Sequence, residues 1–123
     1  MKTLSLLPLL LAAVPLFAQP DDPAKVLFDL GTRDEQTGRV DRAKLTLLTL
    51  ASTYQGNPLA DKAKVELGAI FLYLEAQSQI RAGQNTTAYG TLRTLLRVYP
   101  ESPLAKRADD TARSLGIPAD PRK

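Results

Sequence analysis

The sequence contains no cysteine, no histidine and no tryptophan among its 123 residues. The absence of cysteine excludes a disulfide framework, a thiolate metal site and a lipid-anchoring cysteine. Without histidine and cysteine, the Ser-His and Cys-His nucleophile systems are excluded as well. A glycine-rich phosphate loop is also absent. The sequence therefore predicts a protein that is not an enzyme, with no catalytic residues, no cofactor and no metal site.

Charge of either sign is spread thinly along the chain. There are 16 Lys and Arg against 13 Asp and Glu, and no basic run exceeds two residues. This balance predicts an ordinary solvated surface and no nucleic-acid partner. The acidic pairs Asp34-Glu35 and Asp109-Asp110 point in different directions on a helix, because neighbouring residues lie about 100° apart. Both pairs are predicted to be solvated.

The N-terminus has the pattern of a signal peptide. A cation at Lys2 precedes an almost wholly apolar run at 4–17, and the small residue Ala18 follows. This order predicts a secretory signal peptide over 1–18 that is cleaved after Ala18. The run is short for a membrane span. The mature chain, 19–123, is therefore predicted to be exported as one helical domain that is soluble, not lipidated and without a membrane span.

One ten-residue stretch, 54–63, recurs 45 residues later at 99–108. The positions that are identical are Tyr54 and Tyr99, Pro58 and Pro103, Leu59 and Leu104, Ala60 and Ala105, and Ala63 and Ala108. A fixed period of this length in a helical pattern is typical of stacked helical hairpins. The repeat therefore indicates an all-α fold.

Three pairs of residues, Asp22-Pro23, Asn57-Pro58 and Ser102-Pro103, predict helix starts. Asp, Asn and Ser cap a helix N-terminus, and Pro at the first helical position loses no hydrogen bond. We name the helices that follow these pairs the A helices and the helices between them the B helices. The predicted A helices are 23–37, 58–82 and 103–115, and the predicted B helices are 41–54 and 87–99. This gives a short α-solenoid of about two hairpins with a C-terminal capping helix.

Apolar stripes of helical period mark the predicted core. The two B helices carry matching stripes, at Ala43, Leu47, Leu50, Ala51 and Tyr54 and at Ala88, Leu92, Leu95, Leu96 and Tyr99. The second A helix carries two stripes, at Ala63, Leu67, Ile70, Phe71 and Leu74 and at Val65, Ala69, Leu72, Tyr73 and Ala76. A helix that is apolar on two sides is expected to be packed on two sides. Gly38 and Gly56 are expected to end helices, Asn85 or Thr86 to cap one, and Gly90 to pack tightly against a neighbour.

These residues resemble tetratricopeptide repeats. The family's Leu-Gly pair in helix A is matched at 30–31 and 67–68, its small residue in helix B at Ala43 and Ala88, and its closing Pro at Pro100. The usual period is about 34 residues, and the longer period here lies in an extended second A helix. The resemblance covers 23–116 and implies a scaffold for protein–protein interaction.

The run from Tyr99 to Ala105 is similar to the bacterial envelope branch of this family. That branch includes the lipoprotein subunit of the outer-membrane β-barrel assembly machine and the periplasmic coordinator of the Tol-Pal system. The resemblance implies a periplasmic scaffold that binds another envelope protein or peptide, as an accessory factor in envelope or outer-membrane protein assembly. The alternative is a structural subunit that completes its solenoid by self-association or within a larger envelope complex.

The family register also implies a binding surface. In that register the A helices line a concave groove for peptides, and apolar centres with basic edges suit a peptide of some acidic character. The matching positions are Lys25, Phe28, Thr32, Lys62, Val65, Ala69, Tyr73, Arg107, Asp110 and Ser114. The alternative is that these side chains only pack one A helix on another.

Overall fold

The computed structural model describes residues 22–117, which form five α-helices and no strand. The helices are α2 (Pro23–Gln36), α3 (Val40–Thr53), α4 (Pro58–Arg81), α5 (Asn85–Val98) and α6 (Ala105–Ser114). The all-α fold is therefore confirmed, and the arrangement is consistent with helical repeats, while the α-solenoid stays a prediction. The predicted signal peptide, its cleavage site and residues 118–123 lie outside the described part of the chain.

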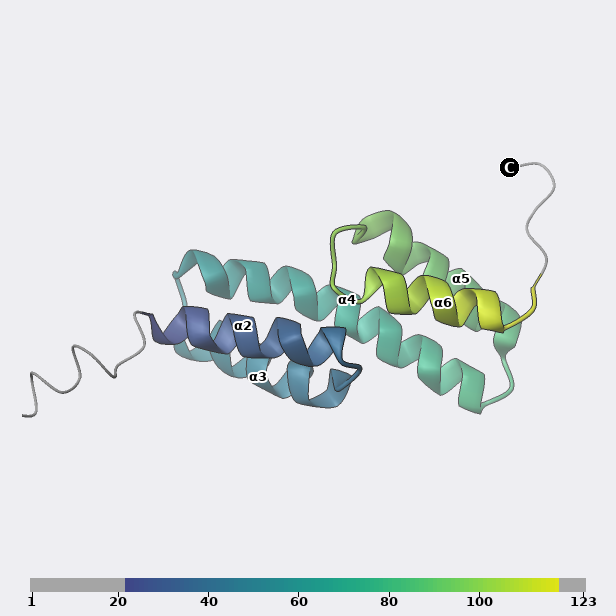
Figure 1. Cartoon of the computed structure of the whole chain (residues 1–123), viewed down its shortest axis with the longest axis horizontal. Coiled ribbons are helices and arrows are strands. Elements are labelled where there is room, and N and C mark those ends of the chain that lie inside the picture. Colours follow the sequence, from purple (N-terminus) through teal and green to yellow (C-terminus); the bar gives the residue numbers. More distant parts are fainter. Residues whose placement is uncertain (1–21, 118–123) are drawn as a thin grey trace, which may run out of the picture.

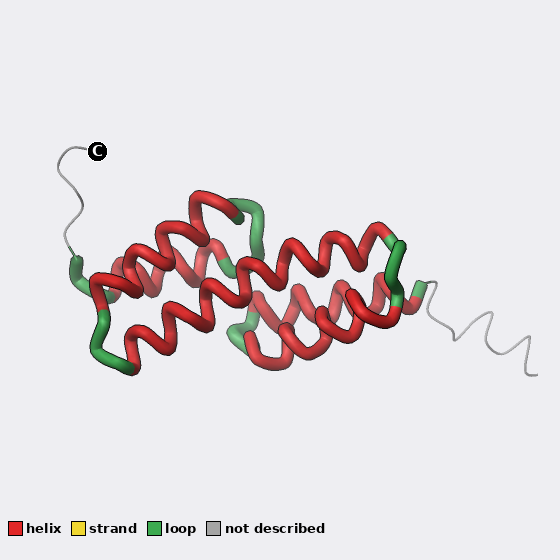
Figure 2. The backbone as a smooth tube through the Cα atoms, turned by 180° about the vertical axis from the view of Figure 1, so that it is seen from behind, coloured by secondary structure: helices red, strands yellow, loops and turns green. Residues whose placement is uncertain are grey.

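The long helix α4 runs through the middle of the molecule (Figure 1). It packs against α3 and α5 and, less extensively, against α2, while α6 packs on α5. Figure 2 shows the same arrangement from behind, with α2 and α3 along the first half of α4 and α5 and α6 along the second half. No helix within 22–117 combines the length and apolarity needed to cross a membrane.

Two helix starts follow the predicted capping mechanism. The Asp22 Oδ1 accepts a hydrogen bond from the Ala24 N–H at 3.0 Å. The Asn57 Oδ1 accepts one from the Leu59 N–H at 2.8 Å. Each bond satisfies one of the N–H groups that a helix start leaves unpaired.

The starts of α5 and α6 differ from the prediction. The Ser102 Oγ accepts from the Leu104 N–H at 3.1 Å, but α6 begins only at Ala105, because the residues after Ser102 form a turn. The start of α5 is also different. Gln84 is its N-cap residue and makes no side-chain capping bond, so the predicted cap at Asn85 or Thr86 is wrong.

The ends of α2 and α3 match the prediction. Gly38 and Gly56 follow these helices with φ of 85° and 88°. A residue with a Cβ rarely adopts this left-handed conformation, which is why glycine is favoured just after a helix end.

The core lies along α4, and each of its two apolar stripes is buried over only part of its length. The first stripe is buried at Ala63, Leu67 and Ile70, and the second at Ala69, Tyr73 and Ala76. Val65 begins the second stripe and is 55% exposed, and Phe71, near the end of the first stripe, is 52% exposed. Their predicted burial is wrong because each half of α4 is covered by a different pair of helices.

The B stripes form the matching side of the core. The members that are fully buried are Ala43, Leu47, Leu50, Ala88, Leu92 and Leu95. Tyr54 and Tyr99 are partly buried against this core.

Glycines give two of these side chains room. A Cβ on Gly31 would lie 2.6 Å from the Leu47 Cδ2, and one on Gly68 would clash with the Tyr99 hydroxyl. Gly90 has no such role, since nothing lies within 4 Å of a Cβ built there. Its predicted tight packing is wrong because this side of α5 faces solvent.

Candidate functional site

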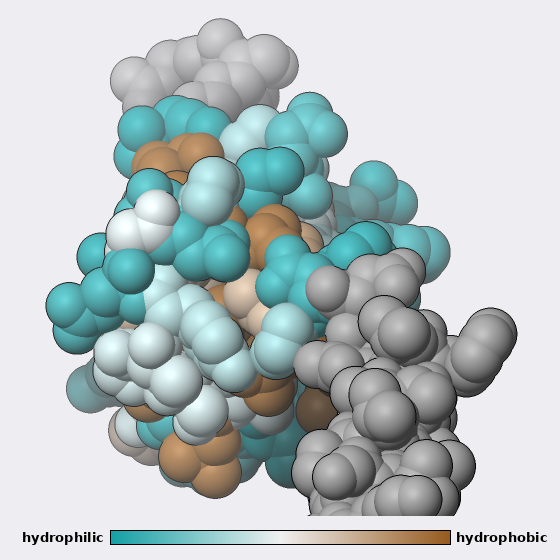
Figure 3. Space-filling view, turned by 90° about the vertical axis from the view of Figure 1, so that its left-hand side faces the viewer, coloured by the Kyte–Doolittle hydropathy of each residue, from teal (hydrophilic) through white to brown (hydrophobic). Residues whose placement is uncertain are grey.

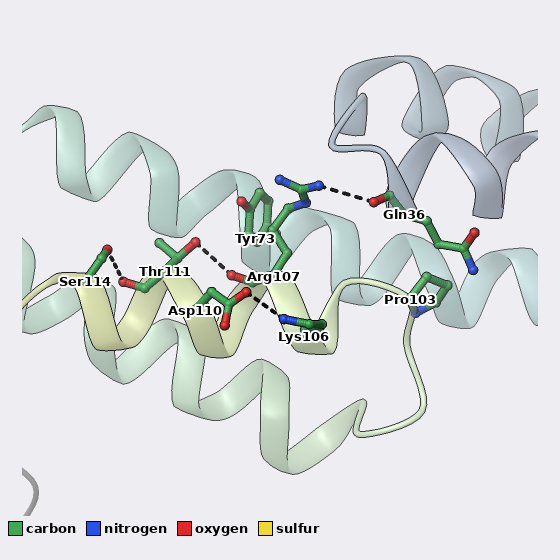
Figure 4. Close-up of a pocket in the computed structure, with 8 residues that line it drawn as sticks. All are labelled: Gln36, Tyr73, Pro103, Lys106, Arg107, Asp110, Thr111 and Ser114. Carbon is green, nitrogen blue, oxygen red and sulfur yellow. Dashed lines mark hydrogen bonds and ion pairs between the residues drawn. The ribbon is translucent and has the colours of Figure 1, made fainter.

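A hollow of about 600 Å³ lies where the three A helices, α2, α4 and α6, meet (Figure 4). We call it the A-face hollow. Its lining residues are Gln36, Tyr73, Pro103, Lys106, Arg107, Asp110, Thr111 and Ser114. It is assembled from positions far apart in the sequence, because the end of α2 reaches the start of α6.

Arg107 joins the two sides of the A-face hollow. Its side chain rises from α6 toward α2 (Figure 4), and its Nη2 donates a hydrogen bond to the Gln36 carbonyl oxygen at 3.2 Å. That oxygen belongs to the last turn of α2, where carbonyl groups carry partial negative charge, so the cation stabilises the helix end. The Arg107 Nε is buried and has no hydrogen-bond partner in the described part of the chain. The guanidinium is thus fixed in position, and only part of its hydrogen-bonding capacity is used.

Tyr73 forms the floor of the A-face hollow. Its side chain comes from the middle of α4 and lies beside Arg107 (Figure 4). Tyr73 is only 4% exposed. The ring therefore packs mainly in the core, and a ligand in the hollow would touch no more than its edge.

The rim of the hollow carries polar side chains of α6. The Lys106 Nζ and the Asp110 Oδ2 form an exposed ion pair at 3.1 Å. The Thr111 and Ser114 hydroxyl groups donate to main-chain oxygens of their own helix at 2.8 and 2.6 Å. The lining contains two cations, Lys106 and Arg107, and one carboxylate, that of Asp110. The hollow therefore has a net positive charge.

Four of the ten predicted groove residues line the A-face hollow, namely Tyr73, Arg107, Asp110 and Ser114. The other six lie elsewhere, and the structure places them as follows. Lys25 pairs with Asp29, Phe28 packs on the core, the Thr32 hydroxyl donates to the Phe28 carbonyl oxygen, Lys62 and Val65 are exposed, and Ala69 is buried. Sequence reasoning missed Gln36, Pro103, Lys106 and Thr111. Lys106 and Thr111 lie next to the predicted positions Arg107 and Asp110 on α6. The helical period of this segment could therefore have identified them.

The acidic pair at the end of α2 is buried, against the prediction of a solvated face. Asp34 is 3% exposed and Glu35 is 0% exposed. The Asp34 Oδ2 lies 3.7 Å from the Arg42 Nε of α3. Glu35 is turned instead toward Glu66 of α4 and Ser102 of the α5–α6 turn. The two side chains point in different directions, as predicted. Both are nevertheless buried, because neighbouring helices and the α5–α6 turn enclose this end of α2.

The carboxyl groups of Glu35 and Glu66 interact, and this interaction affects the protonation of Glu35. The Ser102 hydroxyl donates its only proton to the Glu66 Oε1 at 2.9 Å, so it can relieve Glu35 little. No donor in the described residues bonds to the Glu35 oxygens. Burial raises the pKa of Glu35 to about 9, and hydrogen bonding with Glu66 and repulsion from it add to the rise. Glu35 is therefore protonated at neutral pH and can donate to Glu66.

Apolar and polar side chains are mixed on the surface at the end of the molecule that lies on the left in Figure 1. Figure 3 shows brown apolar areas on that end interspersed with teal polar ones. Within 22–117, no group of three or more acidic side chains is placed to hold a metal ion. Comparisons with protein-family models, curated proteins and solved structures found no match.

Proposed function

We propose that this chain is an exported helical-repeat scaffold that binds a segment of another protein in the A-face hollow. The observation that carries the proposal is Arg107. Its guanidinium lines the hollow and donates one hydrogen bond to the end of α2, which leaves its other Nη donors for a ligand, whereas its Nε is buried. A fixed cation with unused donors is suited to an acceptor on a ligand.

The chemistry of the hollow favours an acidic or carbonyl-rich segment. Arg107 and Lys106 provide positive charge, while Tyr73 provides an apolar floor. Asp110 already pairs with Lys106, so a competing carboxylate would displace it at little cost, because exposed ion pairs contribute little. The N-terminal segment and the resemblance to envelope repeats support a periplasmic partner, such as an envelope protein under assembly.

Site-specific crosslinking tests this proposal. A photoreactive amino acid at Lys106, on the rim of the hollow, is expected to capture a partner in cells, whereas the same group at Arg97, an exposed residue of α5 outside the hollow, is expected to capture none. The captured protein is then purified, and the segment that carries the crosslink is mapped. Equal capture of that protein at both positions would contradict binding through the A-face hollow.

A structural subunit that self-associates is the second candidate, and one observation favours it. Leu45 and Leu48 lie about one turn apart on α3, and both are exposed. Such a pair is suited to contact with a second copy or a neighbouring subunit. Light scattering of the purified chain should then show a dimer, and Leu45→Lys with Leu48→Lys should give a monomer. A monomeric parent chain across micromolar concentrations would exclude self-association.

A further inference from the structure

A second, smaller hollow of about 200 Å³ lies where α4 meets the α5–α6 turn. We call it the turn hollow. Its lining residues are Val65, Glu66, Val98, Tyr99, Pro100, Glu101 and Ser102. It shares none of these residues with the A-face hollow.

The walls of the turn hollow are apolar. Val65 and Val98 come from different helices, and both are exposed. Tyr99 is fixed, because its hydroxyl occupies the space that a Cβ on Gly68 would need. Exposed valines beside a fixed ring and Pro100 form a surface that the stem of a long side chain can cover.

The polar groups of the turn hollow are acidic. Glu66 and Glu101 both line it, and neither forms an ion pair with a cation of the described chain. Lys62 lies one helical turn before Glu66 and still leaves it unpaired. Ser102 holds the Glu66 carboxylate at 2.9 Å, so this acceptor is already oriented.

A fully buried acid lies behind this lining. Glu35 is completely enclosed, and its carboxyl group faces Glu66 and Ser102, two of the residues that line the turn hollow. Both of its oxygens are buried without a hydrogen-bond partner in the described part of the chain, which is costly even for a neutral carboxyl group. The side chains that act on it are those of Glu66 and Ser102, whereas Arg42 pairs with Asp34 and Arg107 donates to Gln36. Because Glu35 is neutral, the negative charge of the turn hollow comes from Glu66 and Glu101, and no cation of the described chain pairs with either.

We propose that the turn hollow binds a lysine or arginine side chain of a partner protein. The aliphatic stem lies along Val65 and Val98, and the cationic end lies between the Glu66 and Glu101 carboxylates. Charge complementarity selects this occupant, because a charged donor satisfies two acceptors that lack a cation. The chain would then have two recognition hollows of opposite charge, since the A-face hollow is cationic.

An NMR titration of the ¹⁵N-labelled protein tests this site with N-acetyl-lysine methylamide as the probe. We expect saturable shift changes at the amides of Val65, Val98 and Glu101. The glutamate analogue of the probe should produce none, because its charge is opposite. Changes that do not saturate, or that spread over the whole surface, would overturn the proposal.

Matched variants make the test specific. Glu101→Gln removes one carboxylate from an exposed turn residue, so it should leave the fold intact and weaken probe binding at least threefold. Glu66→Gln should weaken it further. Glu75→Gln makes the same change at an exposed position of α4 outside the hollow and should have no effect. An unchanged affinity in a folded Glu101→Gln protein would count against the site even if Glu66→Gln failed to fold.

Discussion

Helices α3 and α5 have the same length and the same inner face, but they present different outer faces. Each has 14 residues. The matched inner pairs Ala43 and Ala88, Leu47 and Leu92, and Leu50 and Leu95 are all buried. On the outside, Leu45 and Leu48 of α3 are exposed, and the residues 45 positions later are Gly90 and Arg93, which are exposed too.

This difference shows what the repeat preserves. The inner positions recur because each B helix must fill the space beside α4, and a close-packed interior tolerates little change of volume. The outer positions carry no such constraint, so the two helices differ there in apolarity and charge. Recognition surfaces must therefore be found helix by helix, since the repeat itself specifies only the core.

The largest expected effect is on the shared inner face. Leu92→Ala and Leu47→Ala each leave a cavity in the core and should lower the free energy of unfolding by roughly 2–5 kcal/mol. That is a large share of the about 5–15 kcal/mol that a small domain has. Arg93→Ala, on the outer face, should cost under about 0.5 kcal/mol. Urea unfolding of the three variants measures this, and equal losses for Leu92→Ala and Arg93→Ala would refute the helix phase.

The second prediction concerns pH and compares the buried acid Glu35, near the end of α2, with an exposed acid of α4. The folded state raises the pKa of Glu35 from 4.5 to about 9, so between these values the folded chain holds a proton that the unfolded chain has lost. Stability from this group is therefore complete below about pH 4.5 and falls as pH rises toward 9, at up to about 1.4 kcal/mol per pH unit.

Glu35→Gln removes this titration while keeping the shape of the side chain. The thermal midpoint of the parent should fall relative to that of Glu35→Gln between pH 5 and pH 9, with the variant the more stable at pH 8. Glu75→Gln is the control, because this acid is exposed. A parent and a Glu35→Gln protein with parallel pH profiles would show that Glu35 is not buried in its neutral form.

The third prediction compares two helical glycines, one on the inner side and one on the outer side. Gly31→Ala puts a Cβ 2.6 Å from the Leu47 Cδ2, so it should destabilise by about 1–3 kcal/mol, as overpacking does. Gly90→Ala meets nothing within 4 Å and should stabilise by roughly 0.5–1 kcal/mol, because alanine is the better helix former. Urea midpoints that move in the same direction for both variants would contradict the assigned inner and outer faces.

The features that the sequence predicted well are local. The capping bonds of Asp22 and Asn57 join residues two positions apart, and the B stripes follow from one helical period. The features that it missed join distant segments. Ser102 and Glu66 are 36 residues apart, and Arg107 and Gln36 are 71 apart. Such contacts depend on how the helices pack on α4, which no local pattern encodes, so Asp34 and Glu35 looked like an ordinary solvated pair.

The same limit applies to the binding surface. The α6 positions Arg107, Asp110 and Ser114 share one helix face, so their proximity followed from the period. Gln36 joins them only because the end of α2 reaches α6. Val65 was assigned to the same groove by register, and it lines the turn hollow instead.

The affinity of Arg107 variants for the captured partner segment tests the central claim most directly. Arg107→Gln removes the cation of the A-face hollow, and Arg93→Gln makes the same change on the outer face of α5. Calorimetric titration should show at least a tenfold weaker affinity for Arg107→Gln, which corresponds to about 1.4 kcal/mol, and no change for Arg93→Gln. Circular dichroism must first show that both variants keep the parent's helical spectrum. If a folded Arg107→Gln protein binds the segment as tightly as the parent does, the A-face hollow is not the binding site.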